Sequence, residues 1–387
     1  MNDTTRESQQ ALAAVERLQR LFAAQRVACL AQPSPRADER IARLKSLKRQ
    51  TQRYQDLLAD AMSRDFGFRP VAESKLLDLL GSVLDANHAI SHLKRWMKPS
   101  RRSTELLFLS NRIKVTYQPK GVVGVIVPWN FPIYLAMGPL VTALAAGNRV
   151  MIKMSEVTPA TNAVFKALLR EVFDEDLVAV VGEELVDPNV FTALPFDHIV
   201  FTGSPAVGRV VMRTAAQNLT PVTLELGGKS PAIIGARANF EKAVERIVVG
   251  KSLNAGQTCI APDYVLLPAG SEQDFIESAR RVFAASYPDF ATTPDYTAIV
   301  NDRHFARLTE LVDEARAQGA EIIELAPGAR HDPATRRFPP LLLRGVKPDM
   351  RVMQEEIFGP LLPLVSCGDL AQAIDYINAR PRPLALY

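Results

Sequence analysis

The uncharged stretch G-V-V-G-V-I-V-P-W-N-F-P-I-Y-L-A-M-G-P-L-V-T-A-L-A-A-G (121–147) decides how the chain folds. It is long enough to span a membrane as a single helix. Four residues interrupt it, three of them prolines: Pro128, Asn130, Pro132 and Pro139. Because proline removes a backbone hydrogen-bond donor and breaks helices, one continuous spanning helix is disfavoured. The stretch instead predicts a buried strand at 121–127, then a turn, then a helix near 132–146.

The same alternation of short β-rich runs and helices continues toward the carboxyl terminus. It predicts strands at 149–154, 177–181 and 198–202 and a helix near 159–173. A second series follows Glu225, with strands at 230–235 and 264–268 and helices at 239–252, 271–286 and 302–318. Strands that alternate with helices predict a parallel sheet covered on both faces, so the expected fold class is α/β.

The amino-terminal region has a different pattern. Helical periodicity predicts helices at 9–25, 37–64 and 71–96. They are followed by T-E-L-L-F-L-S-N-R-I-K-V-T-Y-Q-P-K-G (104–121), which predicts a hairpin of two strands around Ser110-Asn111. A chain of 387 residues is long enough for two domains. We expect their boundary at 224–228, where two glycines follow a strand.

The composition is that of an ordinary globular protein, with 47% hydrophobic and 23% charged residues. The net charge of +4 is small for this length. The basic run at 36–50 has no interleaved aromatic residues, so a solvated helix face is favoured over a nucleic-acid surface. The first ten residues lack the apolar core of a secretory signal, and no membrane association is expected.

Cysteine and histidine usage argues against both disulfides and metals. The three cysteines, Cys29, Cys259 and Cys367, are widely spaced and odd in number, which favours a reducing cytoplasm. His88 and His92 are four residues apart, but the glutamate of a zinc-protease motif does not follow the first, and no third ligand is evident. We therefore expect no metal site.

Cys259 lies in a setting that a structural role explains poorly. It occurs in N-A-G-Q-T-C-I-A-P-D (254–263), among glycine and polar residues. A core cysteine has apolar neighbours, a zinc ligand has partners at short spacing, and a disulfide needs a second cysteine. Since none of these fits well, a nucleophile is the hypothesis to test.

Two polar residues lie beside apolar strands, where chemistry could use them. Asn130 follows a wholly apolar strand and is either a structural turn cap or a donor for an oxyanion. Glu225 stands between two leucines. Burial there would raise its pKa toward the range of a general base, whereas the alternative is an exposed carboxylate at a strand end.

Two strand ends could hold parts of a nucleotide. In H-I-V-F-T-G-S-P-A-V-G-R-V-V-M (198–212), Gly203 allows a tight turn, Ser204 can cap the following helix, and Gly208 allows close packing. The helix start offers free N–H groups to an anion, although many strand-to-helix turns look alike for structural reasons. Lys153 and Glu156 end another strand, where a carboxylate could bind a ribose diol or lie in a solvated turn.

Five motifs occur together and in a fixed order: P-W-N-F-P (128–132), F-T-G-S (201–204), L-E-L-G-G-K-S-P (224–231), G-Q-T-C (256–259) and E-E-I-F-G-P (355–360). As a set they resemble the NAD(P)-dependent aldehyde dehydrogenases, over residues from about 100 to 387. The separation of Glu225 and Cys259 is also similar to that of the family. C-I-A-P-D-Y after the cysteine and the compact amino-terminal region resemble the class 3 branch.

The resemblance implies an architecture. A Rossmann-like parallel-sheet NAD-binding domain is expected at 1–100 and 120–224, a bridging oligomerisation hairpin at 101–119, and an α/β catalytic domain at 225–387. The stretch at 380–387 looks like the beginning of a strand, and members of the family continue beyond it. A homodimer of the full-length chain, located in the cytoplasm, is also implied.

The resemblance further assigns roles to individual residues. Cys259 matches the nucleophile that attacks the aldehyde carbon, and Asn130 matches the side chain that holds the oxyanion together with the backbone N–H of Cys259. Glu225 matches the base that activates water for thioester hydrolysis. The implied cofactor contacts are Trp129, Lys153, Glu156, Gly203, Ser204, Gly208, Leu226, Glu356 and Phe358. Among them, Lys153 and Glu156 would contact the adenosine ribose, Ser204 the pyrophosphate, and Glu356 with Phe358 the nicotinamide ribose.

The implied reaction is the oxidation of an aldehyde to its carboxylic acid with NAD, through a cysteine thiohemiacetal and a thioester. The substrate is a small molecule, expected to be an aromatic aldehyde such as coniferaldehyde or a medium-chain one. Glu156 would repel a 2′-phosphate and so favours NAD, while the class 3 resemblance leaves NADP open. Apolar residues near the catalytic positions could line a substrate tunnel or serve as ordinary core: Phe131, Tyr134, Leu135 and Ile260.

Two alternative functions stay open at this point. The first is an acylating enzyme in which coenzyme A, rather than water, takes the acyl group. Glu225 argues against it, since a water-activating base would waste the thioester. The second is a non-catalytic binding or structural relative that keeps the fold, and the intact state of all five motifs argues against that.

Overall fold

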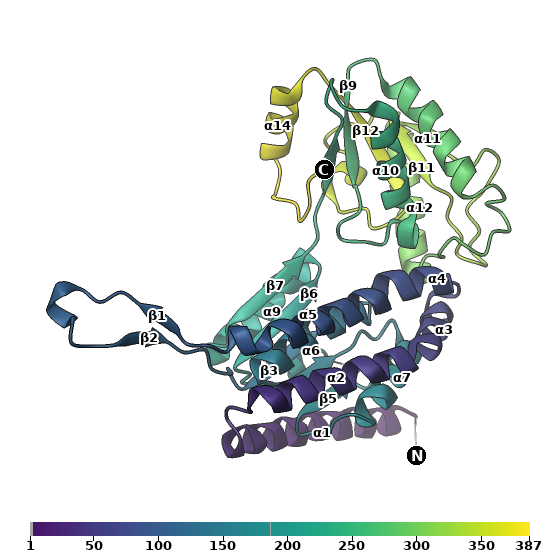
Figure 1. Cartoon of the computed structure of the whole chain (residues 1–387). Helices are drawn as coiled ribbons and strands as arrows, with labels where there is room; N and C mark the ends of the chain where they lie inside the picture. Colours follow the sequence, from purple (N-terminus) through teal and green to yellow (C-terminus); the bar gives the residue numbers. More distant parts are fainter. Residues whose placement is uncertain (1–2, 186) are drawn as a thin grey trace. The chain divides into compact units, whose positions relative to one another are not determined.

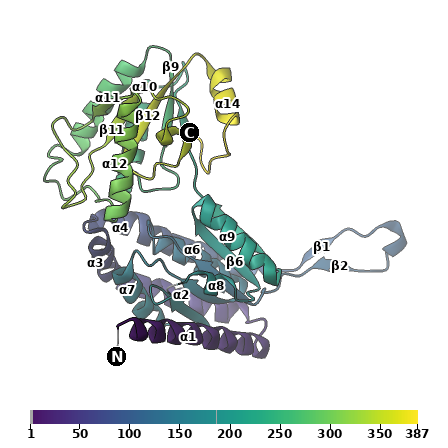
Figure 2. The same ribbon diagram turned by 180° about the vertical axis from the view of Figure 1, so that it is seen from behind.

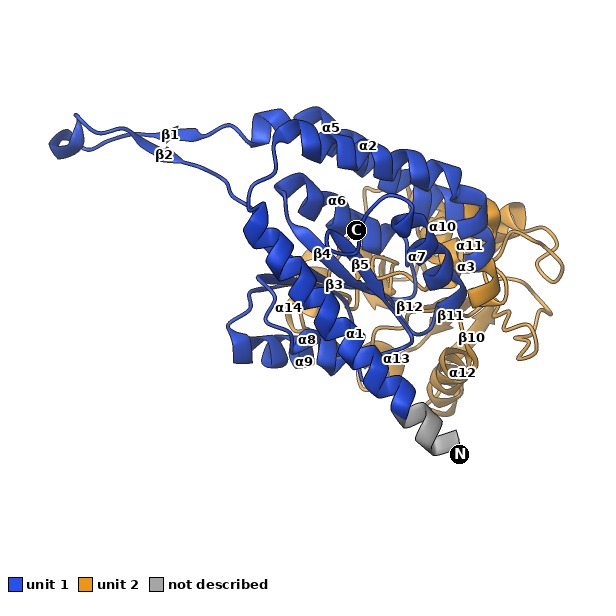
Figure 3. Cartoon of the chain, turned by 90° about the horizontal axis from the view of Figure 1, so that it is seen from below, with its two compact units in different colours: residues 1–61, 74–225 blue, residues 62–73, 226–387 orange. Residues whose placement is uncertain are grey.

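A computed structural model describes residues 3–185 and 187–387 of the chain. It divides into two compact units (Figure 3). Unit 1 comprises residues 1–61 and 74–225, and unit 2 comprises residues 62–73 and 226–387. The main division falls between Glu225 and Leu226, within the stretch where the glycines predicted a boundary. A short amino-terminal segment, residues 62–73, belongs with the carboxyl-terminal unit.

Unit 1 is built on a five-stranded sheet in the order β5-β4-β3-β6-β7 (Figure 1). Its strands are β3 (Val122–Ile126), β4 (Arg149–Lys153), β5 (Val178–Val181), β6 (His198–Gly203) and β7 (Val222–Leu226). The pairs β3–β4, β3–β6 and β4–β5 are parallel. The strand interiors are apolar, and β3, β4 and β5 are almost wholly buried, as sequences covered on both faces are. The predicted α/β class is confirmed.

Helices cover both faces of this sheet (Figure 3). The helices of unit 1 are α1 (Asp3–Ala31), α2 (Ala37–Arg53), α5 (Gly81–Trp96), α6 (Tyr134–Ala146), α7 (Pro159–Arg170), α8 (Asn189–Thr192) and α9 (Pro205–Ala215). Two further helices, α3 (Gln55–Phe66) and α4 (Val71–Ser74), lie where the chain passes from one unit to the other. Helix α6 packs against β3 and β4, and α2 and α5 pack against α6. Helix α1 contacts the same two strands from the opposite face. The helix predicted at 37–64 is interrupted at Tyr54, where α2 ends and α3 begins.

The stretch 121–147 forms the predicted strand, turn and helix. Strand β3 starts at Val122, and helix α6 runs from Tyr134 to Ala146 and is capped by Gly147, whose φ of 89° is left-handed. The carboxylate of Asp78 accepts hydrogen bonds from the backbone N–H groups of Ile133 and Tyr134, at 3.1 and 3.0 Å. Asp78 lies in a π-helical segment (Lys75–Leu80) between α4 and α5, so a side chain from another element caps this helix.

The hairpin differs in detail from its prediction. Its strands are β1 (Ser100–Arg102) and β2 (Ile113–Val115), paired antiparallel, so the first strand lies before the predicted range of 104–121. Between them, residues 106–108 form a 3₁₀ turn in which the Phe108 N–H donates to the Glu105 carbonyl at 2.9 Å. These local hydrogen bonds replace ladder pairing, which is why the apolar run L-L-F-L (106–109) is not a strand.

Unit 2 contains a second five-stranded sheet, in the order β10-β11-β12-β9-β8 (Figure 2). Its strands are β8 (Pro231–Ile233), β9 (Tyr264–Pro268), β10 (Glu321–Glu324), β11 (Leu341–Arg344) and β12 (Leu361–Cys367). All neighbouring pairs are parallel except β10–β11. Its helices are α10 (Phe240–Ser252), α11 (Glu272–Ser286), α12 (Asp302–Ala317), α13 (Arg351–Gln354) and α14 (Leu370–Asn378). Large buried side chains such as Tyr264, Phe275 and Phe338 fill the core.

Two further properties concern the residues that the structure describes. None of their helices combines the length and apolarity needed to cross a bilayer. In the same residues, no three side chains of histidine, cysteine, aspartate or glutamate come together in a way that could hold a metal ion.

Candidate active site

Several predicted site residues of unit 1 follow the carboxyl ends of neighbouring parallel strands. Asn130 lies four residues after β3, Lys153 ends β4, and Gly203 ends β6. In the ladder, Ile126 pairs with both Lys153 and Phe201, so these strands end at one edge of the sheet. Ligands of open α/β sheets bind outside this edge. Asn130 is only 2% exposed and Trp129 is partly buried, so the polar amide is held within the turn.

Lys153 and Glu156 form an ion pair at the end of β4. The Lys153 Nζ donates to Glu156 Oε2 at 3.0 Å. The lysine side chain is 6% exposed, whereas that of the glutamate is 66% exposed. A buried ammonium therefore holds an accessible carboxylate at the strand end, which is an arrangement suited to accepting hydrogen bonds from sugar hydroxyls.

The turn between β6 and α9 is shaped by its small residues. The Ser204 Oγ accepts from the Val207 N–H at 3.4 Å and so caps α9, and Pro205 occupies the first position of that helix. A Cβ atom added at Gly203 would lie 2.6 Å from the ring of Phe201. Gly208 is buried one turn into the helix. The amino end of this 11-residue helix thus offers backbone N–H groups to an anion.

Glu225 lies near the end of β7, where side chains alternate between half-buried and exposed. The glutamate belongs to the exposed set and Leu226 to the half-buried set. The hypothesis that this carboxylate is desolvated is therefore wrong, and the alternative of an exposed carboxylate at a strand end is the one observed. The period of two along a strand explains this, because flanking leucines face the opposite side.

Cys259 of unit 2 is a central residue of a tight turn. The Ala261 N–H donates to the Thr258 carbonyl at 3.0 Å, which closes the turn around Cys259 and Ile260. The cysteine is half-buried and is not in a disulfide. Just before it, Gly256 has a φ of 72°, and an added Cβ would lie 2.4 Å from the carbonyl oxygen of Gly359. Glycine is required there both for the left-handed backbone and for the close approach.

Gln257 fixes the polypeptide immediately before the nucleophile candidate. Its side chain is fully buried, and its Nε2 donates to the carbonyls of Asn254 and Ala298 at 3.0 and 3.1 Å. Its Oε1 accepts from the Val300 N–H at 3.0 Å. These bonds join the cysteine segment to the loop before α12. This glutamine was not among the residues expected from the sequence, although its amide is polar and flanks the cysteine turn.

Glu356 and Phe358 lie in the loop between α13 and β12. Phe358 has a φ of 48°, which is unusual for a bulky residue. A Cβ added at Gly227 would lie 2.3 Å from both carboxylate oxygens of Glu356, so this carboxylate packs directly on the glycine backbone after β7. Burial raises the pKa of Glu356 to about 7. Its Oε1 is buried and has no hydrogen-bond partner within the part of the chain that the structure describes.

Three charged side chains, Lys229, Lys251 and Asp263, interact electrostatically with this carboxylate. None of them was expected from the sequence. Lys229 Nζ donates to Asp263 Oδ2 and to the carbonyls of Val352 and Glu355. Asp263 Oδ1 accepts from the Ile357 N–H at 3.1 Å and lies 3.9 Å from Lys251 Nζ. We call Lys229, Lys251, Asp263 and Glu356 the charge cluster. Its members join three of the five motifs: the loop after β7, the cysteine segment and the loop before β12.

Lys251 is the most deeply buried cation of the charge cluster. It is 3% exposed, and its Nζ makes no hydrogen bond to any residue that the structure describes. Burial lowers the pKa of Lys251 to about 8, while Asp263 opposes that change. The lysine occupies the last turn of α10, eight positions before Cys259, and a lysine in a helix is ordinarily solvated. That is why its sequence context gave no signal.

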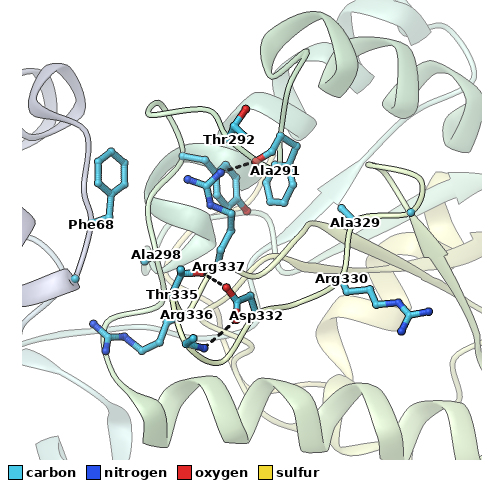
Figure 4. A pocket seen from close by; sticks show the side chains of 15 residues that line it. Phe68, Ala291, Thr292, Ala298, Ala329, Arg330, Asp332, Thr335, Arg336 and Arg337 are labelled. Atoms are coloured by element: carbon cyan, nitrogen blue, oxygen red, sulfur yellow. Dashed lines mark hydrogen bonds between the residues drawn. The ribbon is translucent and has the colours of Figure 1, made fainter.

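A cavity of about 700 Å³ also lies within unit 2, away from these residues (Figure 4). Loops form its wall, including Phe68, Tyr296, Asp332 and Arg337. Arg337 donates to the carbonyl of Thr293 at 2.7 Å and also to that of Phe290, and Asp332 accepts from Thr335 at 2.7 Å. None of the residues predicted from sequence lines this cavity.

The structure thus groups the predicted residues within each unit. In unit 1, Trp129, Asn130, Lys153, Glu156, Gly203, Ser204 and Gly208 all follow strand ends of one sheet, with Glu225 near the end of β7. In unit 2, Cys259 and the Glu356–Phe358 loop are tied to the segment after Leu226 by the charge cluster.

Comparison with known proteins gives a consistent set of relatives. The model of the aldehyde dehydrogenase family matches residues 5–386. The chain is 50% identical to "Probable coniferyl aldehyde dehydrogenase" of Pseudomonas aeruginosa, over 98% of this chain and 79% of that protein. It is 38% identical to "Aldehyde dehydrogenase family 3 member A2" of Mus musculus, over 90% of this chain and 70% of that protein.

Solved structures agree. The substrate-bound state of Staphylococcus aureus AldH matches with a TM-score of 0.89 at 36% identity, covering 95% of this chain and 79% of that one. An aldehyde dehydrogenase of Mycobacterium tuberculosis complexed with NAD⁺ matches with a TM-score of 0.81 at 27% identity, covering 93% of this chain and 75% of that one.

Proposed function

The chain belongs to the aldehyde dehydrogenase family, and from that premise we propose which of its residues carry out each step of the reaction. The resemblance inferred from the five motifs is confirmed. The protein is an oxidoreductase that converts an aldehyde to the carboxylic acid with a nicotinamide cofactor. The single observation that supports the assignment of residues is the tight turn that presents the half-buried Cys259, which is in no disulfide, four positions before Asp263 of the charge cluster.

Cys259 is the proposed nucleophile. Its sulfur, as the thiolate, attacks the carbonyl carbon of the aldehyde and forms a thiohemiacetal. An ordinary thiol is only a few per cent ionised at neutral pH, so nearby donors are needed to favour the thiolate. The amide of Asn130 and the backbone N–H of Cys259 are the proposed donors to the oxyanion. The 2% exposure of Asn130 supports this, because a buried donor is already desolvated.

Glu225 is the proposed base of the hydrolytic step. It removes a proton from water, which attacks the thioester and releases the carboxylic acid and the free Cys259 thiol. The exposure of this carboxylate at the end of β7 is compatible with access to water. A water-activating base also distinguishes this mechanism from acyl transfer to coenzyme A, which remains the alternative.

The described residues fit the nicotinamide cofactor at three places. The buried Glu356 Oε1 lacks a partner and is suited to a ribose hydroxyl, with Phe358 beside it. The capped start of α9 with Ser204 is suited to a pyrophosphate. The Lys153–Glu156 pair is suited to the adenosine ribose, and its carboxylate favours NAD over NADP. Trp129, Gly203, Gly208 and Leu226 are the remaining proposed contacts. When bound, the cofactor accepts the hydride of the thiohemiacetal carbon.

The proposed substrate is an aromatic aldehyde, with coniferaldehyde as the first candidate. The name of the Pseudomonas aeruginosa relative, at 50% identity, supports it. Phe131 in unit 1 and Ile260 beside the nucleophile add apolar surface, Phe131 largely buried and Ile260 half exposed. A medium-chain aldehyde would contact the same side chains.

A homodimer is the proposed assembly, and the hairpin is its proposed contact. The hairpin extends from unit 1 as a separate arm (Figure 1), and large apolar side chains on it are exposed: Leu106, Leu107, Leu109 and Tyr117. Isolated exposed leucines are common, but a group of them on one arm is typical of an interaction surface. A reducing cytoplasm is the proposed location, supported by the odd number and wide spacing of the three cysteines.

One assay tests the proposed reaction. Purified protein is mixed with NAD and coniferaldehyde without coenzyme A, NADH is followed by absorbance, and the product is identified by chromatography. We expect NADH and the carboxylic acid in equal amounts. Product that appears only with coenzyme A, as a thioester, would support the acylating alternative. No NADH with a panel of aromatic and medium-chain aldehydes would support the non-catalytic one.

Cys259→Ser is the decisive variant in that assay. Because a serine hydroxyl is a far weaker nucleophile at neutral pH, NADH formation should fall by more than about 1,000-fold. Cys29→Ser, in helix α1 of unit 1, is the matched control and should keep the full rate. A wild-type rate in the Cys259→Ser protein would show that this sulfur is not the nucleophile, and the proposed mechanism would be refuted.

A further inference from the structure

A backbone hydrogen bond closes the turn that carries Cys259. That bond runs from the Ala261 N–H to the Thr258 carbonyl, at 3.0 Å. Ile260, the second central residue, has a half-exposed side chain. A contact on the outer side of the turn adds to the interactions that fix the position of the sulfur.

Such a contact comes from the segment 385–387, which runs beside β8. The Tyr387 N–H donates to the Pro231 carbonyl at 3.0 Å, and the Tyr387 carbonyl accepts from the Ile233 N–H at 2.8 Å. The Ala385 N–H also donates to Ser230 Oγ at 3.3 Å. Strand β8 is the last strand in the order of its sheet, so these bonds attach the backbone of Tyr387 to the sheet framework. The tyrosine Cα is thereby fixed.

The side chain of Tyr387 reaches from this fixed position to the nucleophile turn. Its phenol Oη donates to the Ile260 carbonyl at 2.6 Å. The pKa of Tyr387 is raised, because burial and the nearby Cys259 sulfur both disfavour a phenolate. The phenol is therefore neutral at physiological pH and can donate. The hydrogen bond places its hydroxyl beside Ile260, the residue that follows Cys259.

We propose that Tyr387 is a positioning residue for the nucleophile. Its hydroxyl holds the Ile260 carbonyl on the outer side of the turn, and the Thr258–Ala261 bond holds the inner side. With both in place, the Cys259 sulfur and its backbone N–H keep one orientation. Misplacing a reacting group by about 1 Å can lower a rate by about 100-fold, so a single fixing hydrogen bond has a measurable effect. This inference rests on the proposed role of Cys259.

Tyr387→Phe tests it, because phenylalanine keeps the ring and removes only the hydroxyl. We expect kcat to fall about tenfold while the KM for NAD stays unchanged, since no cofactor contact is assigned to this residue. Tyr387→Leu should show a loss of similar size. Tyr376→Phe is the matched control, because this tyrosine lies on α14 of the same unit, where its ring contacts Arg380. It should keep the wild-type kcat.

A second measurement does not depend on turnover. Iodoacetamide alkylation of each cysteine is followed by peptide mass mapping in the absence of cofactor and substrate. In Tyr387→Phe we expect Cys259 to react about threefold more slowly, because without the hydroxyl contact the backbone donors of the turn are aligned less well with the thiolate. The rates at Cys29 and Cys367 should not change, and they report any general loosening of the fold.

The outcomes are distinguishable. A normal kcat and a normal Cys259 alkylation rate in Tyr387→Phe would overturn the proposal, even if Tyr387→Leu is impaired, because only ring packing would then matter. Equal losses in Tyr387→Phe and Tyr376→Phe would also overturn it, as would faster alkylation at all three cysteines. A different result would refute the proposed function itself, namely a Cys259→Ser protein that keeps the wild-type activity.

Discussion

The strand-end region of unit 1 and the charge cluster of unit 2 hold their site residues by different means. In unit 1, Lys153 and Gly203 are placed by the ends of parallel strands and Ser204 by the start of a helix, so secondary structure alone fixes them. In unit 2, long-range contacts between buried charges hold three loops together. We infer that unit 1 tolerates loss of a site side chain without unfolding, and that unit 2 does not.

The largest expected effect comes from breaking the charge cluster at its centre. Asp263→Asn keeps the shape of the side chain but leaves Lys229 and Lys251 without their buried counter-charge. Removing one partner from a buried ion pair costs about 3–5 kcal/mol. The free energy of unfolding, measured by urea titration, should fall by that amount. Asp313→Asn, an exposed carboxylate on α12 paired with Arg316, should change it by less than about 0.5 kcal/mol. Equal values for the two variants would refute the comparison.

Asn130→Ala tests the opposite property of unit 1. Losing one donor to an oxyanion lowers turnover by about 100- to 1,000-fold in other enzymes, and we expect a kcat loss in that range. The fold should persist, because α6 and β3 are held by their own hydrogen bonds and packing. Steady-state kinetics check the loss of kcat, and thermal unfolding of the same variant checks that the fold persists. Near-normal turnover would remove Asn130 from the mechanism.

The pH dependence of stability sharpens the comparison, because burial strongly alters the pKa values of two site groups of unit 2. Burial raises the pKa of Glu356 from 4.5 to about 7, so between these values the folded state binds more protons than the unfolded state. Stability contributed by this group therefore falls as pH rises through that window. Burial lowers the pKa of Lys251 from 10.5 to about 8, so stability contributed by the lysine rises with pH between 8 and 10.5.

The joint contribution of these two groups should therefore be lowest between about pH 7 and 8. Calorimetric melting temperatures across the pH range, measured without cofactor, check this in wild type, Glu356→Gln and Lys251→Met. The melting temperature of wild type minus that of Glu356→Gln should decline from pH 4.5 to 7 and then level off. The melting temperature of wild type minus that of Lys251→Met should rise above pH 8. Parallel curves for all three proteins would contradict it.

The smallest effect is expected at the start of α9. Ser204→Ala removes the hydrogen bond to the Val207 N–H, which spans 3.4 Å. Loss of such a cap costs about 0.5–2 kcal/mol, and the longer bond here favours the lower end. Because the backbone N–H groups of the helix remain, the KM for NAD should rise only a few-fold. A rise of 100-fold would show that this side chain, and not the helix start, provides the contact.

The difference between the regions also explains what the sequence could predict. The strands of unit 1 are short apolar runs that alternate with helices, and their ends identified Lys153 and Gly203 directly. Strands β10, β11 and β12 were not predicted, because runs such as L-L-L-R (341–344) do not distinguish a buried strand from a buried helix. A hairpin was predicted correctly, but the position of its first strand was wrong, because the apolar run at 106–109 resembles a strand.

The site of unit 2 was predictable only in part. The motifs indicated Cys259 and Glu356 as candidates, but not the contacts around them, because Lys229 and Asp263 are 34 positions apart. Asp263 did carry a weak signal, since it is a carboxylate directly before the apolar strand β9, where burial is costly. For Glu225 the same reasoning failed, because the open side of β7 leaves its carboxylate exposed.

The assignment of residues 62–73 to unit 2 has a consequence for how the polypeptide is made on the ribosome. Glu73 accepts from the Asn254 N–H at 2.6 Å, and the Phe68 carbonyl accepts from the Ala298 N–H at 2.9 Å. Both acceptors emerge early in translation, whereas their partners are synthesised after all of unit 1. During that interval residues 62–73 lack these hydrogen-bond partners. Expressing residues 226–387 alone would therefore omit a segment that belongs to unit 2. Dissection of this protein therefore requires supplying 62–73 in trans or grafting it by circular permutation.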